Sequence, residues 1–183
     1  MKHEVRAGTT ALMQAYSSHS RLRVGFLLDD LTATAQLATR LAQHCDAGDI
    51  VALHGTLGAG KTSFAREFIQ ALGLDEEVPS PTFTLVQTYP LEDHAADAIW
   101  HFDMYRINNP AEAYELDIED AFESGISLVE WPEKLGELLP EDCLHLHLSM
   151  TENEGERLAS LDGGANWTQR LGALTSELSE LVT

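Results

Sequence analysis

One octapeptide limits the folds that are open to this chain. Residues 55–62 are Gly-Thr-Leu-Gly-Ala-Gly-Lys-Thr, which matches the phosphate-loop pattern G-x-x-x-x-G-K-[ST] in full. Glycines let the backbone approach a phosphate closely, and the N-terminus of a following helix adds N–H donors and partial positive charge. The required neighbours are present, because residues 49–54 are typical of a buried strand and helical spacing runs from about residue 61 to 72. The motif therefore predicts an α/β protein that binds a nucleoside triphosphate.

Strand-like and helix-like segments alternate along the rest of the chain. Strands are expected near residues 24–28, 82–89, 98–103, 127–131, 144–148 and 156–162, and helices near residues 32–41, 109–122 and 167–181. This order predicts a P-loop NTPase-like three-layer α/β domain with a mainly parallel sheet and additional antiparallel strands. We expect residues 22–183 to form this single ATPase domain, with residues 1–21 as a loosely ordered extension. A transit peptide is the alternative for the extension.

The charge balance disfavours several classes of protein. Eleven Lys and Arg residues against thirty Asp and Glu residues give a net charge of −19. Gripping nucleic acid or an anionic membrane requires basic patches, so autonomous binding to either is disfavoured. No apolar run approaches the roughly 18 to 20 residues that a membrane span needs. Cys45 and Cys143 are too few for a disulfide scaffold and lack metal-ligand spacing, so we expect a reduced, cytoplasmic setting.

Two acids that end neighbouring strands are candidates for the magnesium side of the site. Asp103 and Glu130 each follow an apolar run, and the carboxyl ends of parallel strands lie at the same edge of a sheet as the phosphate loop. In such sites an acid holds Mg²⁺ or its waters, the loop lysine (Lys61) reaches the phosphates and the next hydroxyl (Thr62) ligates the metal. The spacing does not decide which acid contacts the metal. An ordinary exposed acid at a strand end is the alternative for each.

Four further side chains near this edge have two readings each. Thr82 lies where a loop that senses the γ-phosphate is expected, and its hydroxyl is a candidate ligand for water or metal. His101 alternates with Asp103 and so shares its strand face, although a packed histidine is the favoured reading. Arg106 contacts a phosphate or a partner's acid, or is merely solvated. Trp131 stacks near the nucleotide or packs in the core.

Four blocks of sequence, taken together, resemble one known family. They are Val51-Ala52-Leu53-His54-Gly55 running into the phosphate loop, Ser80-Pro81-Thr82-Phe83-Thr84-Leu85-Val86, His101-Phe102-Asp103-Met104-Tyr105-Arg106 and Leu128-Val129-Glu130-Trp131-Pro132. In this order they resemble the bacterial TsaE (YjeE) family, the small ATPases of tRNA threonylcarbamoyladenosine biosynthesis. The resemblance covers roughly residues 24–162. Met104 departs from it by standing where leucine is familiar, which is a volume-conserving swap.

The resemblance implies a set of site residues. ATP would be held by Gly55, Thr56, Leu57, Gly58, Ala59, Gly60, Lys61, Thr62, Ser63, Trp131, Gly155 and Arg157, and Mg²⁺ by Thr62 and Glu130. Lys61, Asp103 and Thr82 would serve catalysis, with Asp103 as the Walker B-like acid and Ser80 in the same switch-like loop as Thr82. Residues 30–34 would flank the base.

The resemblance also implies partners. TsaD-type proteins transfer a threonylcarbamoyl group to adenosine 37 of tRNAs that read codons beginning with A, and the small ATPase acts with TsaB-type and TsaD-type proteins without performing the transfer. The tRNA would then be contacted only through that complex, in agreement with the acidic charge. The run from residue 111 to 156, with fourteen acids and one base, is a solvated face or a surface for a basic partner.

Two rival functions use the same phosphate loop. A small-molecule kinase needs a lid with arginines and an acceptor pocket, yet only Arg106, Arg157 and Arg170 lie beyond residue 66. A nucleotide-dependent binding switch without turnover is the second rival. No arginine finger is identifiable, so we expect turnover by the chain alone to be slow and to rise with partners.

Overall fold

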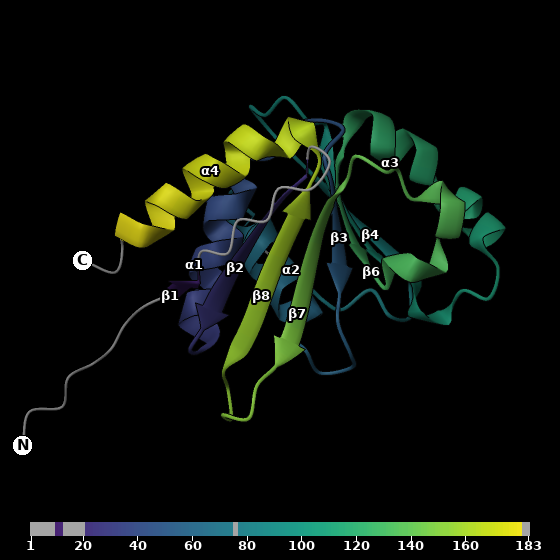
Figure 1. Cartoon of the computed structure of the whole chain (residues 1–183). Helices are drawn as coiled ribbons and strands as arrows, with labels where there is room; N and C mark the ends of the chain where they lie inside the picture. Colours follow the sequence, from purple (N-terminus) through teal and green to yellow (C-terminus); the bar gives the residue numbers. More distant parts are fainter. Residues whose placement is uncertain (1–9, 13–20, 75–76, 181–183) are drawn as a thin grey trace, which may run out of the picture.

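The computed structural model describes residues 10–12, 21–74 and 77–180. Within them, eight strands form one sheet in the order β1-β2-β8-β7-β3-β6-β5-β4 (Figure 1). The strands are β1 (Thr10–Leu12), β2 (Leu22–Leu28), β3 (Ile50–His54), β4 (Val86–Pro90), β5 (Ala98–Asp103), β6 (Ile126–Glu130), β7 (Leu144–Met150) and β8 (Arg157–Gly163). The helices are α1 (Leu31–Ala42), α2 (Lys61–Ala71), α3 (Ile118–Ser124) and α4 (Ala165–Glu180), with 3₁₀ turns at Met104–Arg106, Pro110–Leu116, Pro132–Lys134 and Gly136–Leu138.

The centre of the sheet is parallel and its flanks are antiparallel. Strands β7, β3, β6 and β5 run in one direction, whereas β4 on one side and β8, β2 and β1 on the other are added antiparallel. The predicted α/β fold with a parallel sheet and extra antiparallel strands is confirmed. Three described strand pairings are parallel and four are antiparallel, a larger antiparallel share than expected, because β1 and β2 join the late β7–β8 hairpin instead of the parallel centre.

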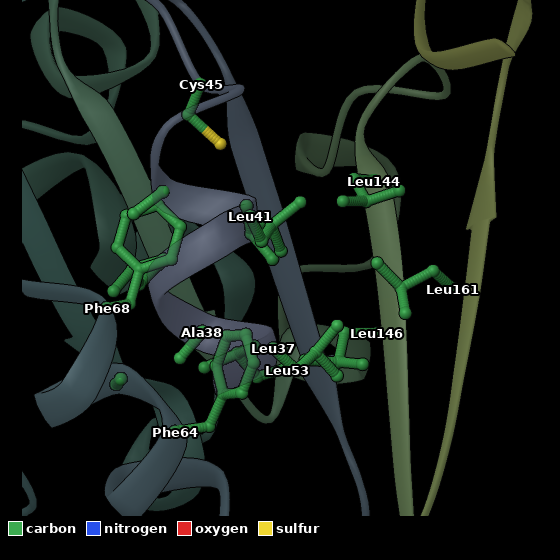
Figure 2. Packing of buried hydrophobic residues seen from close by; sticks show 14 of the residues in the cluster. Leu37, Ala38, Leu41, Cys45, Leu53, Phe64, Phe68, Leu144, Leu146 and Leu161 are labelled. Carbon is green, nitrogen blue, oxygen red and sulfur yellow. The ribbon is translucent and has the colours of Figure 1, made fainter. Parts of the chain in front are cut away.

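Helices cover both faces of the sheet and give the predicted three layers. On one face α1, α2 and α4 pack over a core that includes Leu37, Phe64 and Leu53 (Figure 2). On the other face α3 and the neighbouring 3₁₀ turns enclose a second core, which includes Phe102 and Val129. The apolar side chains of β3 alternate between these two cores, so this strand is buried on both faces.

The terminal helix covers the chain's own sheet, as the apolar stripe predicts. Trp167, Leu171, Leu174 and Leu178 of α4 are buried, and α4 contacts α1, β2 and β8. Arg170 stacks over the Trp167 ring and pairs with Asp49, which fastens the start of the helix to the loop before β3. No helix in the described ranges is long and apolar enough to cross a membrane.

Two predicted elements differ from the structure. The strand expected at residues 82–89 begins only at Val86, because residues 81–84 form a turn in which the Leu85 N–H donates to the Pro81 carbonyl at 2.6 Å. The helix expected at residues 109–122 has the predicted Asn109 cap, completed by Glu112, but it is interrupted. It divides at Asp117, whose φ of 56° lies in the left-handed region, into a 3₁₀ turn and α3.

The N-terminal extension contributes one described element. Residues 10–12 form β1, which pairs antiparallel with residues 25–27 of β2. Residues 1–9 and 13–20 lie outside the described residues, so the loose order expected there, and the transit-peptide alternative, stay predictions. Position 181, which the sequence places in the terminal helix, also lies outside the described residues.

Candidate functional site

The phosphate loop joins the central strand β3 to α2 in the way that the motif predicts. Gly55 has a φ of 146°, and a Cβ there would lie 2.5 Å from the Leu148 carbonyl oxygen and 2.9 Å from the Ala59 Cβ. Gly58 and Gly60 have φ values of 80° and 106°, which side-chain-bearing residues rarely adopt. The loop therefore requires glycine at these three positions for steric reasons, and α2 begins directly after Gly60.

Lys61 folds back over its own loop. Its Nζ donates to the carbonyl oxygens of Gly55 and Thr56 at 2.7 and 3.1 Å and lies 3.9 Å from the centre of the Trp131 ring. Burial lowers the pKa of this ammonium, while the negative charges of Glu130, Asp103 and Glu133 act to raise it. The site thus holds a desolvated cation among acids, at the position where a phosphate would replace the carbonyl contacts.

Thr62 and Glu130 form one polar pair beside this lysine. The Thr62 hydroxyl donates to both carboxylate oxygens of Glu130, at 2.8 and 3.0 Å. The pairing of β3 with β6 places Glu130, the last residue of β6, opposite Leu53, which is one residue before the end of β3. The Glu130 side chain is almost fully buried. Because the hydroxyl proton points at the carboxylate, the Thr62 oxygen keeps lone pairs for a cation.

Asp103 serves a different partner. Its Oδ2 accepts a 2.5 Å hydrogen bond from the Thr82 hydroxyl, and its Oδ1 accepts from the Tyr105 N–H at 3.0 Å. The Ser80 hydroxyl lies 2.9 Å from the Thr82 oxygen, so the loop before β4 is tied to the end of β5. Spacing alone leaves open which acid lies next to Thr62; in the structure it is Glu130, while Asp103 holds Thr82.

His101 is the site contact that the sequence reading undervalued. Its side chain is completely buried, and its Nε2 lies 2.9 Å from the Glu130 Oε1. The complete burial agrees with the favoured interpretation of a packed histidine, and the contact with Glu130 is an additional feature that this interpretation did not include. The available signal was its alternation with Asp103, since β5 and β6 pair with Asp103 opposite Glu130 and so bring these side chains to one face.

Two adjoining hollows surround the loop. The smaller, about 310 Å³, is lined by Leu57, Gly58, Gly60, Lys61, Thr62, Ser63, Thr82, Asp103, Tyr105, Glu130 and Trp131. The larger, about 470 Å³, is lined by Asp30, Leu31, Thr32, Thr34, Gly58, Ala59, Gly60, Ser63, Leu148, Gly155 and Arg157. Most of the residues predicted for the site are thus brought together, including the segments near residues 30–34 and 155–157.

Two arginines differ in their relation to these hollows. Arg157 lines the larger hollow and contacts the loop, because it donates from Nε to the Ala59 carbonyl at 3.1 Å and from Nη2 to the Gly58 carbonyl at 3.4 Å. Arg106 lines neither hollow, and its guanidinium lies 5.4 Å from the centre of the exposed Phe83 ring. No group of three or more His, Cys, Asp and Glu side chains suited to a metal ion occurs in the described part of the chain. A cation here would draw on Thr62, Glu130 and a bound phosphate.

The parallel centre, the glycine loop and the strand-end acids define a P-loop-like α/β protein. The crystal structure of Bacillus subtilis YdiB is similar to this chain with a TM-score of 0.67 at 27% identity, covering 91% of this chain and 100% of that chain. A sequence model of the family described as threonylcarbamoyl adenosine biosynthesis protein TsaE matches residues 28–159.

Curated relatives carry the same family name. The tRNA threonylcarbamoyladenosine biosynthesis protein TsaE of Rickettsia felis is 40% identical over 136 residues, which cover 74% of this chain and 77% of that protein. The protein of the same name from Haemophilus influenzae is 42% identical over 102 residues, covering 55% of this chain and 63% of its own length. The chain belongs to the TsaE family, and the resemblance drawn from the four sequence blocks is confirmed.

Proposed function

We propose that this chain is a Mg²⁺-dependent ATPase required for threonylcarbamoylation of adenosine 37 in tRNAs that read codons beginning with A. It acts in the cytoplasm with TsaB-type and TsaD-type proteins and does not perform the transfer itself. The observation that carries the proposal is the meeting of Lys61, Thr62, Glu130 and Asp103 at one edge of three neighbouring parallel strands. Membership of the TsaE family supports the place in tRNA modification.

The two hollows suit the two halves of ATP. The smaller hollow carries Lys61 and the hydroxyl of Thr62, which suit a triphosphate. The larger hollow has more apolar lining, with Leu31 and Leu148, and suits a nucleoside. Because both hollows share Gly58, Gly60 and Ser63, one nucleotide would span them. In this pose Arg157 acts by holding the loop carbonyls, and Gly155 forms part of the wall.

Each polar side chain then has a defined task. Bound Mg²⁺, held by Thr62 and Glu130, would neutralise phosphate charge. Lys61 leaves the loop carbonyls and binds the phosphates, where it stabilises negative charge in the transition state. Asp103 keeps the Thr82 hydroxyl oriented toward the smaller hollow, so that its oxygen positions the attacking water. Catalysis rests on positioning and charge and needs no covalent step on the protein.

The arginines explain why partners are needed. Among the described residues, no arginine lines the smaller hollow. Arg157 is engaged with the loop and Arg170 with Asp49, so neither is available as an arginine finger. Two large apolar side chains are exposed in this region: Leu57, which lines the hollow, at 78%, and Phe83, which follows the lining residue Thr82, at 86%. Such side chains suit a protein partner that completes the site.

The test is phosphate release from Mg·ATP by the purified chain, alone and with its TsaB-type and TsaD-type counterparts. We expect slow turnover alone and a sharp rise with both partners, and no release from a folded Lys61→Ala chain. Turnover that ignores the partners would contradict the proposed coupling. ADP formation that depends on a small-molecule acceptor would instead support a kinase, and tight ATP binding without turnover, even with partners, would support a switch.

A further inference from the structure

Among the described residues, the fully buried side chain of His101 makes one polar contact, and that contact is to the proposed metal-binding acid. His101 lies on β5 and its ring Nε2 is 2.9 Å from the Glu130 Oε1. The parallel pairing of β5 with β6 sets His101 opposite Leu128 and Asp103 opposite Glu130. His101 and Glu130 therefore share the sheet face on which α2 packs, with Thr62 at the start of that helix.

The hydrogen bonds to Glu130 divide its two oxygens unequally. The single hydroxyl proton of Thr62 is shared between Oε1 and Oε2, at 2.8 and 3.0 Å, whereas His101 Nε2 contacts Oε1 alone. Oε2 therefore has fewer donors and keeps more of its acceptor capacity for a cation. Rotating the carboxylate out of its plane would lose the contact with His101. The histidine thus fixes the orientation of the carboxylate and leaves the oxygen that it does not contact for the smaller hollow.

The other ring nitrogen shows that His101 is not placed for packing alone. Its Nδ1 is buried and has no hydrogen-bond partner among the described residues. A hydrogen bond donated by Nε2–H to the Glu130 carboxylate uses one ring nitrogen and leaves Nδ1 without a partner. Leaving such an atom unpaired destabilises the fold, and an apolar side chain would fill the same space without that cost. The bond to Glu130 is the compensating feature.

We propose that His101 is a positioning residue, which holds the Glu130 carboxylate through its Nε2–H so that Oε2 is presented to a divalent cation. The inference rests on the proposed function, because it deepens the role of the same Mg²⁺ site. Side chains that orient metal ligands in this way change metal affinity by about 10- to 100-fold when they are removed. His101 touches neither nucleotide hollow, so its effect passes through Glu130.

The experiment uses electron paramagnetic resonance to measure the binding of Mn²⁺ to the ADP complex of the full chain. Mn²⁺ serves here as a spectroscopic substitute for Mg²⁺. We expect His101→Leu to weaken Mn²⁺ binding about tenfold or more. His101→Gln, whose amide N–H can replace Nε2–H, should recover most of the affinity. The affinity for ADP measured in EDTA should be the same in wild type, His101→Leu and His101→Gln, because binding of ADP without a metal ion does not involve Glu130. A merely structural role would lower ADP binding with and without metal alike.

A second measurement uses the wild-type chain and so does not depend on a variant that folds. Nitrogen-15 histidine spectra should show the Nε2–H tautomer for His101, with a shift when Mg²⁺ is added to the ADP complex and none when ADP is added in EDTA. The Nδ1–H tautomer, or wild-type Mn²⁺ affinity in folded His101→Leu, would overturn the inference. Failure of the wild-type chain to bind ADP or Mn²⁺ would instead overturn the proposed function.

Discussion

Two neighbouring parts of the parallel centre of the sheet, the acid cluster (Lys61, Asp103 and Glu130) and the histidine cluster (His54, His145 and His147), hold their ionisable groups in opposite ways. At the carboxyl edge of β3, β5 and β6, Lys61 lies among the carboxylates of Glu130 and Asp103, each of which has hydrogen-bond donors of its own. In the histidine cluster, His54 of β3 lies beside His145 and His147 of the parallel strand β7, and burial lowers the pKa of all three. The acid cluster pairs its cation and carboxylates with hydrogen-bond partners, whereas burial favours the neutral form of the three histidines.

The difference separates chemistry from stability. Buried ion pairs contribute little net free energy to folding, because the attraction between the charges only offsets the cost of their desolvation. A buried cluster of charged groups is therefore typical of a site that binds a charged ligand. The neutral histidine cluster instead links β3 to β7. His54 Nε2 lies 2.9 Å from His145 Nδ1, and the His54 ring stacks on the His147 ring with 4.3 Å between their centres. Changes in the acid cluster should therefore affect turnover most, and changes in the histidine cluster should affect unfolding most.

Lys61→Ala should have the largest effect on turnover. Among the described residues that line the smaller hollow, Lys61 is the one lysine. Because its ammonium would stabilise the transition-state charge, we expect hydrolysis to fall by at least about 100-fold. The unfolding midpoint in urea should change less than turnover, because the hydrogen bonds of the lysine within the described residues go to carbonyls of its own loop. Phosphate release and urea unfolding of the same preparation give both values. Near-wild-type turnover by the folded variant would remove Lys61 from the mechanism.

Gly55→Ala tests the point at which the two regions touch. The new Cβ would lie 2.5 Å from the backbone oxygen of Leu148 on β7, so loop and strand must both move. Gly73→Ala is a matched control, since Gly73 also has a positive φ, 92°, but nothing lies within 4 Å of its Cβ position. We expect urea unfolding to show a loss of about 3 kcal/mol for Gly55→Ala and about 1 kcal/mol for Gly73→Ala. Equal losses would mean that backbone conformation alone requires the glycine.

The histidine cluster predicts a pH-dependent stability. Burial, then the neighbouring His147, His145 and Lys61, lowers the pKa of His54 to about 4. In the unfolded chain that pKa is about 6.5, so its stabilising contribution is complete above pH 6.5 and is lost as the pH falls toward 4. Between pH 7.5 and 4.5 the wild-type chain should lose about 2 kcal/mol more unfolding free energy than His54→Asn, measured in urea. Equal losses in the two chains would show that His54 titrates normally.

The local parts of this comparison could be predicted from the sequence, and the long-range parts could not. The phosphate loop at residues 55–62 lies between strand and helix signals, and Asp103 and Glu130 each end an apolar run. The residues of the acid cluster could therefore be predicted from the sequence. The His54–His145 contact joins residues 91 positions apart. It depends on β7 pairing with β3, and strand order across a sheet is not encoded in periodicity.

The remaining differences have local physical causes. The loop before β4 has strand-like residues, but Pro81 and the left-handed Leu85 (φ of 67°) hold it as a turn tied to Asp103 through Thr82. Helical spacing continues through Asp117, yet this residue adopts a left-handed conformation that ends one turn and begins α3. The contact of His101 with Glu130 depends on the pairing of β5 with β6, so the sequence of an apolar strand alone does not predict it.

The central claim is that the two strand-end acids divide the work, with Glu130 serving the cation and Asp103 serving Thr82. The most direct test is the gain in ADP affinity on adding Mg²⁺, measured by titration calorimetry for wild type, Glu130→Gln and Asp103→Asn. The account predicts that Glu130→Gln loses about tenfold or more of this gain, whereas Asp103→Asn keeps it within about threefold and loses turnover instead. A larger loss of the Mg²⁺ gain in Asp103→Asn would contradict the account and exchange the two roles.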